Sequence, residues 1–289
     1  MALGVKLGVS TWLWTSPFRT EEAKSLFRKI AALGYRTVEI AVEDPKLIDT
    51  QEISRVLSEN NLEAIVCGAF GPTRDLTSDD EDLQRTGLAY IEACLEIAEA
   101  LGARFVAGPM YSAVGKARMV PPQQRVIEWE RAVGNLRTVC ERAAARGLQI
   151  ALEPLNRFES DLVNNVSDVL RLIEDVGHPA AKICLDMFHM NIEEPDPEAA
   201  IRMAGDKLIH VQVSENYRGT PGTGNANWDA YYRGLDAIGY TGTVSIESFT
   251  PENKELAGAV CIWRNLAEDQ DTFARHGYAF LSKWITGNQ

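Results

Sequence analysis

The 289-residue sequence lacks the features that mark several common classes of protein. No apolar run approaches the roughly 20 residues that cross a bilayer, and no basic segment followed by an apolar core marks a signal peptide. None of the five cysteines forms a C-x-x-C pair. Such an odd, scattered set predicts reduced thiols, and therefore a cytoplasmic protein without disulfides.

Positive charge is also scarce. The chain has 29 lysines and arginines against 41 aspartates and glutamates, a net charge of −12. This balance argues against nucleic acid or an anionic membrane as a main partner, because both repel an acidic protein. Carboxylates suit hard divalent cations instead.

Short apolar segments recur along the chain, and longer helical patterns separate them. The segments are rich in Val, Ile and Leu without clean alternation, which is typical of strands buried on both faces of a parallel sheet. We predict eight strands: Leu7–Thr11, Thr37–Ala41, Ala64–Ala69, Phe105–Gly108, Gln149–Glu153, Lys182–Asp186, Leu208–Val213 and Thr243–Glu247.

The helical patterns between these strands have recognisable ends. Thr20 can cap a helix that stops at Gly34, for example. Eight strands alternating with helices predict a (β/α)8 TIM barrel, with residues 1–289 as one domain. An open doubly wound sheet would need a glycine-rich turn after the first strand, and residues 10–14 contain no glycine.

Four successive predicted strands carry a metal-binding type of residue at or near their carboxyl ends, where barrel enzymes have their active sites. These residues are Glu153, Asp186, His210 and Glu247. Neighbouring strands lie about 4.8 Å apart, so the side chains can converge. Three carboxylates so close together call for a cation. Oxygen ligands with one nitrogen suit Mn²⁺ or Mg²⁺, accommodate Co²⁺ and suit Zn²⁺ less well.

Three motifs around these positions resemble the ketose 3-epimerases, the family of D-tagatose 3-epimerase and D-psicose (D-allulose) 3-epimerase. Residues 153–159 are similar to the family's EPxNRxE motif, and residues 186–194 to its DxxHMNxEE motif. Residues 210–224 resemble H-x-x-x-x-E-x-x-R-G-x-x-G-x-G. The resemblance extends over nearly the whole chain and is densest from Leu152 to Phe249.

This resemblance implies a metal-dependent epimerisation at C3 of free ketoses, such as D-tagatose, D-fructose, D-psicose or L-ribulose, through a cis-enediolate that the metal stabilises. It implies that Glu153, Asp186, His210 and Glu247 bind one divalent ion, with Mn²⁺ favoured. It also implies a homodimer or homotetramer. Glu153 and Glu247 would also be the catalytic acid and base. The implied substrate-binding residues are Glu159, His189, Arg218, Trp14, Cys67, Ala107, Tyr111 and Phe249.

Three other functions remain open at this point. An aldose–ketose isomerase of the hydroxypyruvate or inosose type could use the same metal ligands, but its product would be an aldose. An endonuclease-like barrel uses several metals and many histidines, whereas this acidic chain has four histidines. A non-catalytic sugar-binding barrel would need no acid and base pair.

Overall fold

Eight parallel strands close into a barrel in the computed structural model, which describes residues 2–287. Each strand pairs with the next along the chain, and β1 pairs with β8. The predicted TIM barrel is therefore confirmed, and the predicted strand ends agree within one residue. The strands are β1 (Lys6–Ser10), β2 (Thr37–Val42), β3 (Glu63–Gly68), β4 (Phe105–Gly108), β5 (Gln149–Leu152), β6 (Ala181–Asp186), β7 (Leu208–Val213) and β8 (Thr243–Ile246).

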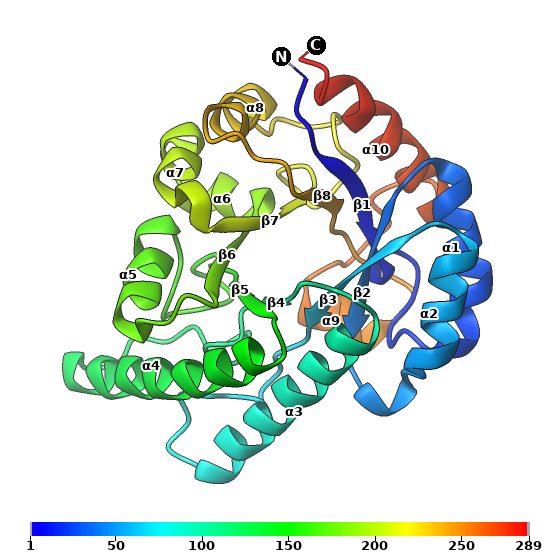
Figure 1. The fold of residues 1–289 in the computed structure, drawn as a ribbon. Coiled ribbons are helices and arrows are strands. Elements are labelled where there is room, and N and C mark those ends of the chain that lie inside the picture. Colours follow the sequence, from blue (N-terminus) through cyan, green and yellow to red (C-terminus); the bar gives the residue numbers. More distant parts are fainter. Residues whose placement is uncertain (1, 288–289) are drawn as a thin grey trace.

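Helices surround the barrel (Figure 1). The main core lies between them and the outward faces of the strands. They are α1 (Thr20–Leu33), α2 (Thr50–Glu59), α3 (Glu81–Ala100), α4 (Pro122–Ala145), α5 (Val166–Val176), α6 (Met187–Glu193), α7 (Pro197–Ala204), α8 (Trp228–Ala237), α9 (Lys254–Ala259) and α10 (Gln270–Trp284).

The sequence predicts no helix at α2, α6 or α9; the helices it predicts are Thr20–Leu33, Leu83–Leu101, Pro122 to about Arg146, one that begins at Ser167, Pro197–Ala204, Trp228–Ile238 and Asp271–Trp284. The helices α6 and α9 have only 7 and 6 residues, too few to show a helical period. The helix α2 has a signal that could have been found. Asp49 caps it by accepting hydrogen bonds from two backbone N–H groups, and Ile53, Val56 and Leu57 form its buried face.

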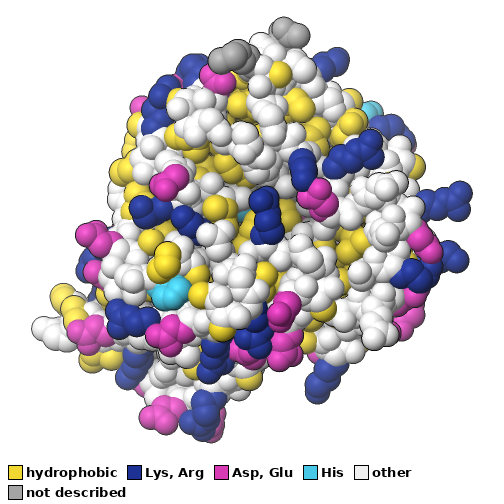
Figure 2. Space-filling model, viewed as in Figure 1, with side chains coloured by type: hydrophobic (Ala, Val, Ile, Leu, Met, Phe, Trp, Pro, Cys, Tyr) yellow, Lys and Arg dark blue, Asp and Glu magenta, His cyan; other side chains and the backbone are white. Residues whose placement is uncertain are grey.

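The two ends of the described chain lie side by side (Figure 1), where the N–H of Leu3 donates a hydrogen bond of 2.8 Å to the carbonyl of Ile285. On the face shown in Figure 2, lysine and arginine side chains are interspersed with aspartate and glutamate. No helix within residues 2–287 combines the length and the apolar character that crossing a membrane requires.

Candidate active site at the carboxyl ends of the strands

Three carboxylates lie buried where β5, β6 and β8 end. Asp186 is the last residue of β6, and Glu153 and Glu247 directly follow β5 and β8. The exposed fractions of Glu153, Asp186 and Glu247 are 4%, 1% and 3%. Asp186 also caps α6, because its side chain accepts a hydrogen bond of 2.9 Å from the N–H of Phe188. The strand and helix ends therefore hold these side chains at the mouth of the barrel.

His189, on α6, connects the carboxylates to the loop after β5. Its Nε2 lies 3.5 Å from Oε1 of Glu153 and 3.6 Å from Oδ2 of Asp186. Its Nδ1 accepts a hydrogen bond of 3.1 Å from the backbone N–H of Asn156. The side-chain amide of Asn156 in turn donates a hydrogen bond of 2.8 Å to Oε1 of Glu159. Glu153, Asp186 and His189 form a buried group whose ligand atoms all lie within 4.8 Å of one another, so the group could hold a metal ion.

Arg218 joins the carboxylates of β6 and β8. Its Nη1 donates hydrogen bonds to Oδ2 of Asp186 and to Oε2 of Glu247, the latter at 2.9 Å. Its Nη2 lies 3.2 Å from Nε2 of His189. The guanidinium also stacks 4.1 Å from the centre of the Phe188 ring, a cation–π contact. Together these contacts place Arg218 among the buried carboxylates.

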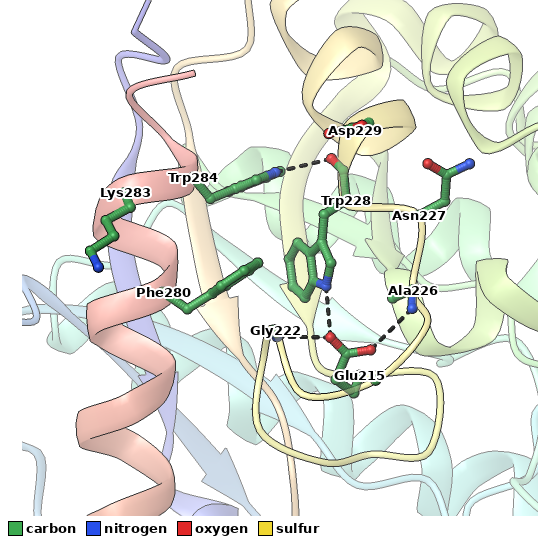
Figure 3. A pocket seen from close by; sticks show the side chains of 10 residues that line it. Glu215, Gly222, Ala226, Asn227, Trp228, Asp229, Phe280, Lys283 and Trp284 are labelled. Carbon is green, nitrogen blue, oxygen red and sulfur yellow. Dashed lines mark hydrogen bonds between the residues drawn. The ribbon is translucent and has the colours of Figure 1, made fainter. Parts of the chain in front are cut away.

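The loop between β7 and α8 holds Arg218 in this position. Arg218 has a φ of 63°, in the left-handed region that costs a residue other than glycine conformational energy. The fully buried carboxylate of Glu215 accepts hydrogen bonds from the N–H groups of Gly222 at 2.7 Å and Ala226 at 3.1 Å, and from the indole of Trp228 at 2.8 Å (Figure 3). Glu215 is the glutamate of the motif at residues 210–224, and no role was predicted for it, although it organises the whole loop.

The electrostatics of the site are dominated by negative charge in a buried environment. Burial raises the pKa of Glu153, and the neighbouring charge of Asp186 raises it further. Burial likewise raises the pKa of Glu247, although Arg218 acts in the opposite direction. For Asp186, burial acts to raise the pKa, but Arg218 and His189 outweigh it and the pKa is lowered. The site therefore favours a cation in addition to Arg218.

His210, one of the four predicted ligands, does not join this group. Its Nε2 lies 2.5 Å from Oε2 of Glu39 on β2, and both side chains are fully buried. Its Nδ1 has no hydrogen-bond partner. The strand continues beyond His210 to Val213, so His210 lies inside the barrel rather than at its mouth. The position at the mouth belongs to Gln212, which lies opposite Asp186 and for which no role was predicted.

An apolar wall borders the site, formed by residues of β2 and β3 and of the segments that follow β1 and β8. Trp12 packs against Phe249 with ring centres 5.5 Å apart. The sequence predicts Trp14 in the substrate pocket instead, but the indole N–H of Trp14 donates a hydrogen bond of 2.7 Å to Asp271 of α10. Trp12 takes the position because β1 ends at Ser10 and a 3-10 turn at Thr11–Leu13 follows, which changes the direction of the chain before Trp14. The wall consists of Trp12, Ala41, Cys67, Phe249, Leu256, Ala257 and Ile262.

Cys67 and Phe249 of the predicted sugar pocket thus lie together, whereas Ala107 and Tyr111 are not part of this wall. Ala107 belongs to an apolar group inside the barrel that also contains Phe105. Tyr111 is fully buried in the main core, and its hydroxyl donates a hydrogen bond of 3.1 Å to the carbonyl of Val163.

Comparisons with known proteins point in the same direction as this geometry. Residues 27–273 match the family model described as "Xylose isomerase-like TIM barrel". A protein of Synechocystis sp. described as "Probable ketose 3-epimerase" is 32% identical over 284 residues, which cover 98% of this chain and 98% of that protein. An "L-ribulose 3-epimerase" of Mesorhizobium japonicum is 31% identical over 96% of this chain and 93% of that protein. The crystal structure of D-allulose 3-epimerase from Methylomonas sp. in complex with D-allulose is 29% identical, with a TM-score of 0.90 over 98% of this chain and 99% of that chain.

Proposed function

The chain belongs to the ketose 3-epimerases of the xylose isomerase-like TIM-barrel family, and from this premise we propose that it inverts C3 of a free ketose with one bound divalent metal ion. One observation carries the proposal: Glu153 and Glu247, from β5 and β8, lie buried with Asp186 and share its charged environment. Such a pair can deliver and remove protons beside a chelated sugar.

The donor set fits a divalent cation. Glu153 and Asp186 lie in one buried group, and Arg218, a permanent cation, joins Asp186 to the buried Glu247 through hydrogen bonds. We assign Glu153, Asp186 and Glu247 as ligands of the ion, with Mn²⁺ favoured and Mg²⁺ or Co²⁺ as substitutes. When bound, the ion would polarise the ketose carbonyl and offset the negative charge that develops on its oxygen.

Glu153 and Glu247 are the proposed acid and base. One carboxylate takes the C3 proton, and the electrons of that C–H bond move towards the carbonyl carbon to give an enediolate. The other carboxyl group returns a proton to the opposite face of C3. The two residues exchange these roles when the reaction runs backwards. Burial raises the pKa of each residue, which favours the protonated form that the acid partner needs.

The remaining side chains suit the binding of a polyol. We propose that Glu159, His189 and Arg218 bind the oxygens near C1 and C2, since Asn156 hydrogen-bonds to both Glu159 and His189 and Arg218 lies 3.2 Å from His189. Trp12, Cys67 and Phe249 would offer apolar surface to the rest of the sugar. The relative bound to D-allulose supports a small ketose as ligand.

The test is an incubation with Mn²⁺ in D₂O, with D-tagatose, D-fructose, D-psicose and L-ribulose supplied separately. We expect a second ketose that carries one deuterium at C3, identified by chromatography and NMR. An aldose product would indicate a 1,2-isomerase. A ketose product without deuterium would contradict proton exchange through the two glutamates.

Two further properties belong to the same proposal. We place the protein in the cytoplasm, which its free thiols support, because all five cysteines are unpaired in the described part of the chain. We also propose a homodimer or homotetramer, which light scattering after gel filtration would test.

A further inference from the structure

Gln212 is the residue of β7 that lies level with the ligand of the neighbouring strand. It is opposite Asp186 on β6 and Ser245 on β8, whereas His210 is opposite Cys184 and Thr243. Two residues along a strand correspond to about 6.6 Å. His210 is thus one layer deeper in the barrel than Gln212, and both side chains point inwards.

The carboxamide of Gln212 is fully engaged by buried neighbours. Its Nε2 donates hydrogen bonds to Oε1 of Glu247 at 2.8 Å and to Oε1 of Glu39 at 2.9 Å. Its Oε1 accepts a hydrogen bond of 3.2 Å from the thiol of Cys184. Gln212 is itself fully buried. The amide therefore fixes the orientation of the Glu247 carboxylate and separates it from the carboxylate of Glu39.

Neither nearby histidine is arranged as a metal ligand. Nε2 of His210 is occupied by Glu39. Nδ1 of His189 accepts the backbone N–H of Asn156, so the neutral ring carries its proton on Nε2, the nitrogen that faces Glu153 and Asp186. A histidine that binds a metal normally donates through its second nitrogen, which is the opposite arrangement.

We propose that the metal centre of this chain has oxygen ligands only, and that Gln212 is a positioning residue that holds Glu247 for the ion. This inference rests on the proposed function in one respect, the binding of a divalent ion at the strand ends. Imidazole ligands favour the later first-row ions, whereas carboxylates suit Mg²⁺ and Mn²⁺. The consequence is a site with little preference for Co²⁺ or Ni²⁺ over Mn²⁺, compared with a site that contains a histidine.

Two reciprocal substitutions test this. Metal-free full-length wild type, Gln212→His and His210→Gln are titrated with Mn²⁺, Co²⁺ and Ni²⁺ by calorimetry, and the visible spectrum of bound Co²⁺ is recorded. We expect Gln212→His to increase the ratio of Co²⁺ to Mn²⁺ affinity about tenfold or more, because it places an imidazole level with Asp186. The Co²⁺ spectrum should change in the same variant.

His210→Gln should leave that ratio within about twofold of wild type, although losing the contact with Glu39 can lower the melting temperature. A selective loss of Co²⁺ affinity in His210→Gln would overturn the inference, and so would an unchanged ratio in Gln212→His. If His210→Gln fails to fold, Gln212→His alone decides. Wild type that binds metal as expected but converts no ketose would contradict the proposed function and leave this inference standing.

Discussion

The two halves of the barrel contribute different chemistry to its mouth. Strands β5, β6 and β8 end in the three buried carboxylates, and the loop after β7 supplies Arg218. The first half contributes Trp12, Ala41 and Cys67 to an apolar wall. A reaction that moves protons needs charged groups around the reacting carbon, while the rest of the substrate needs only shape and apolar surface. Under the proposed function, the reacting end of the sugar would therefore face β5 to β8.

The largest effect should come from removing either proposed proton carrier. Glu153→Gln or Glu247→Gln should lower kcat by about 10³-fold or more, because an amide cannot exchange the C3 proton. The fold should survive, since the amide keeps the shape of the side chain. Turnover of D-psicose and L-ribulose, with circular dichroism as a check on folding, measures this.

Glu159→Gln is a matched control on the same charged side, because Glu159 contacts Asn156 and lies outside the carboxylate trio. It should raise KM while turnover remains measurable. If Glu153→Gln and Glu247→Gln both kept wild-type turnover, the assignment of acid and base to the second half of the barrel would be lost.

Removing the metal should have the next largest effect. Dialysis against EDTA should reduce turnover at least about 100-fold, and Mn²⁺ should restore it. Mn²⁺ at 100 times its Kd should also stabilise the protein by about 2.7 kcal/mol, seen as a higher melting temperature. Full activity in protein that elemental analysis finds free of metal would contradict a metal centre at the mouth.

The carboxylates of the charged half could be predicted because each ends an apolar segment that is recognisable as a buried strand. Which residue of β7 lies at the mouth of the barrel could not be predicted. His210 and Gln212 point to the same side of the strand, so alternation does not distinguish them. In addition, β7 has one residue more than β6 where the register shifts between Ile183 and Cys184. Such a bulge leaves no mark in the sequence.

The apolar half was predicted less well for a related reason. Trp12 and Trp14 both follow β1, and their order in the sequence does not say which one faces the site. The 3-10 turn at Thr11–Leu13 ends the alternation of the strand and brings Trp12 next to Phe249. Tertiary contacts made by residues far apart in the chain decide such positions, so the wall becomes visible only in the structure.

The contrast between the halves predicts a smaller effect for the wall than for the carboxylates. Trp12→Ala should raise KM for ketohexoses about tenfold, which corresponds to about 1.4 kcal/mol of lost binding, with little change in kcat or Mn²⁺ affinity. Trp14→Ala is the control, since Trp14 contacts Asp271 rather than the wall. An equal rise in KM for both variants would contradict the placement of the wall.

The smallest effect on kcat/KM should come from the loop that supports the charged half. In Glu215→Gln, one acceptor oxygen becomes an N–H₂ group that faces N–H donors of the loop, such as that of Ala226. We expect a loss of about 1–3 kcal/mol in the free energy of unfolding, because at least one buried donor loses its acceptor. With Arg218 held less firmly, kcat/KM should fall only several-fold, about tenfold at most.

Exposed Glu268→Gln is the control and should change neither the free energy of unfolding nor kcat/KM. Urea unfolding together with steady-state kinetics measures both. A Glu215→Gln protein as stable and as active as the control would show that Arg218 keeps its left-handed conformation without this carboxylate.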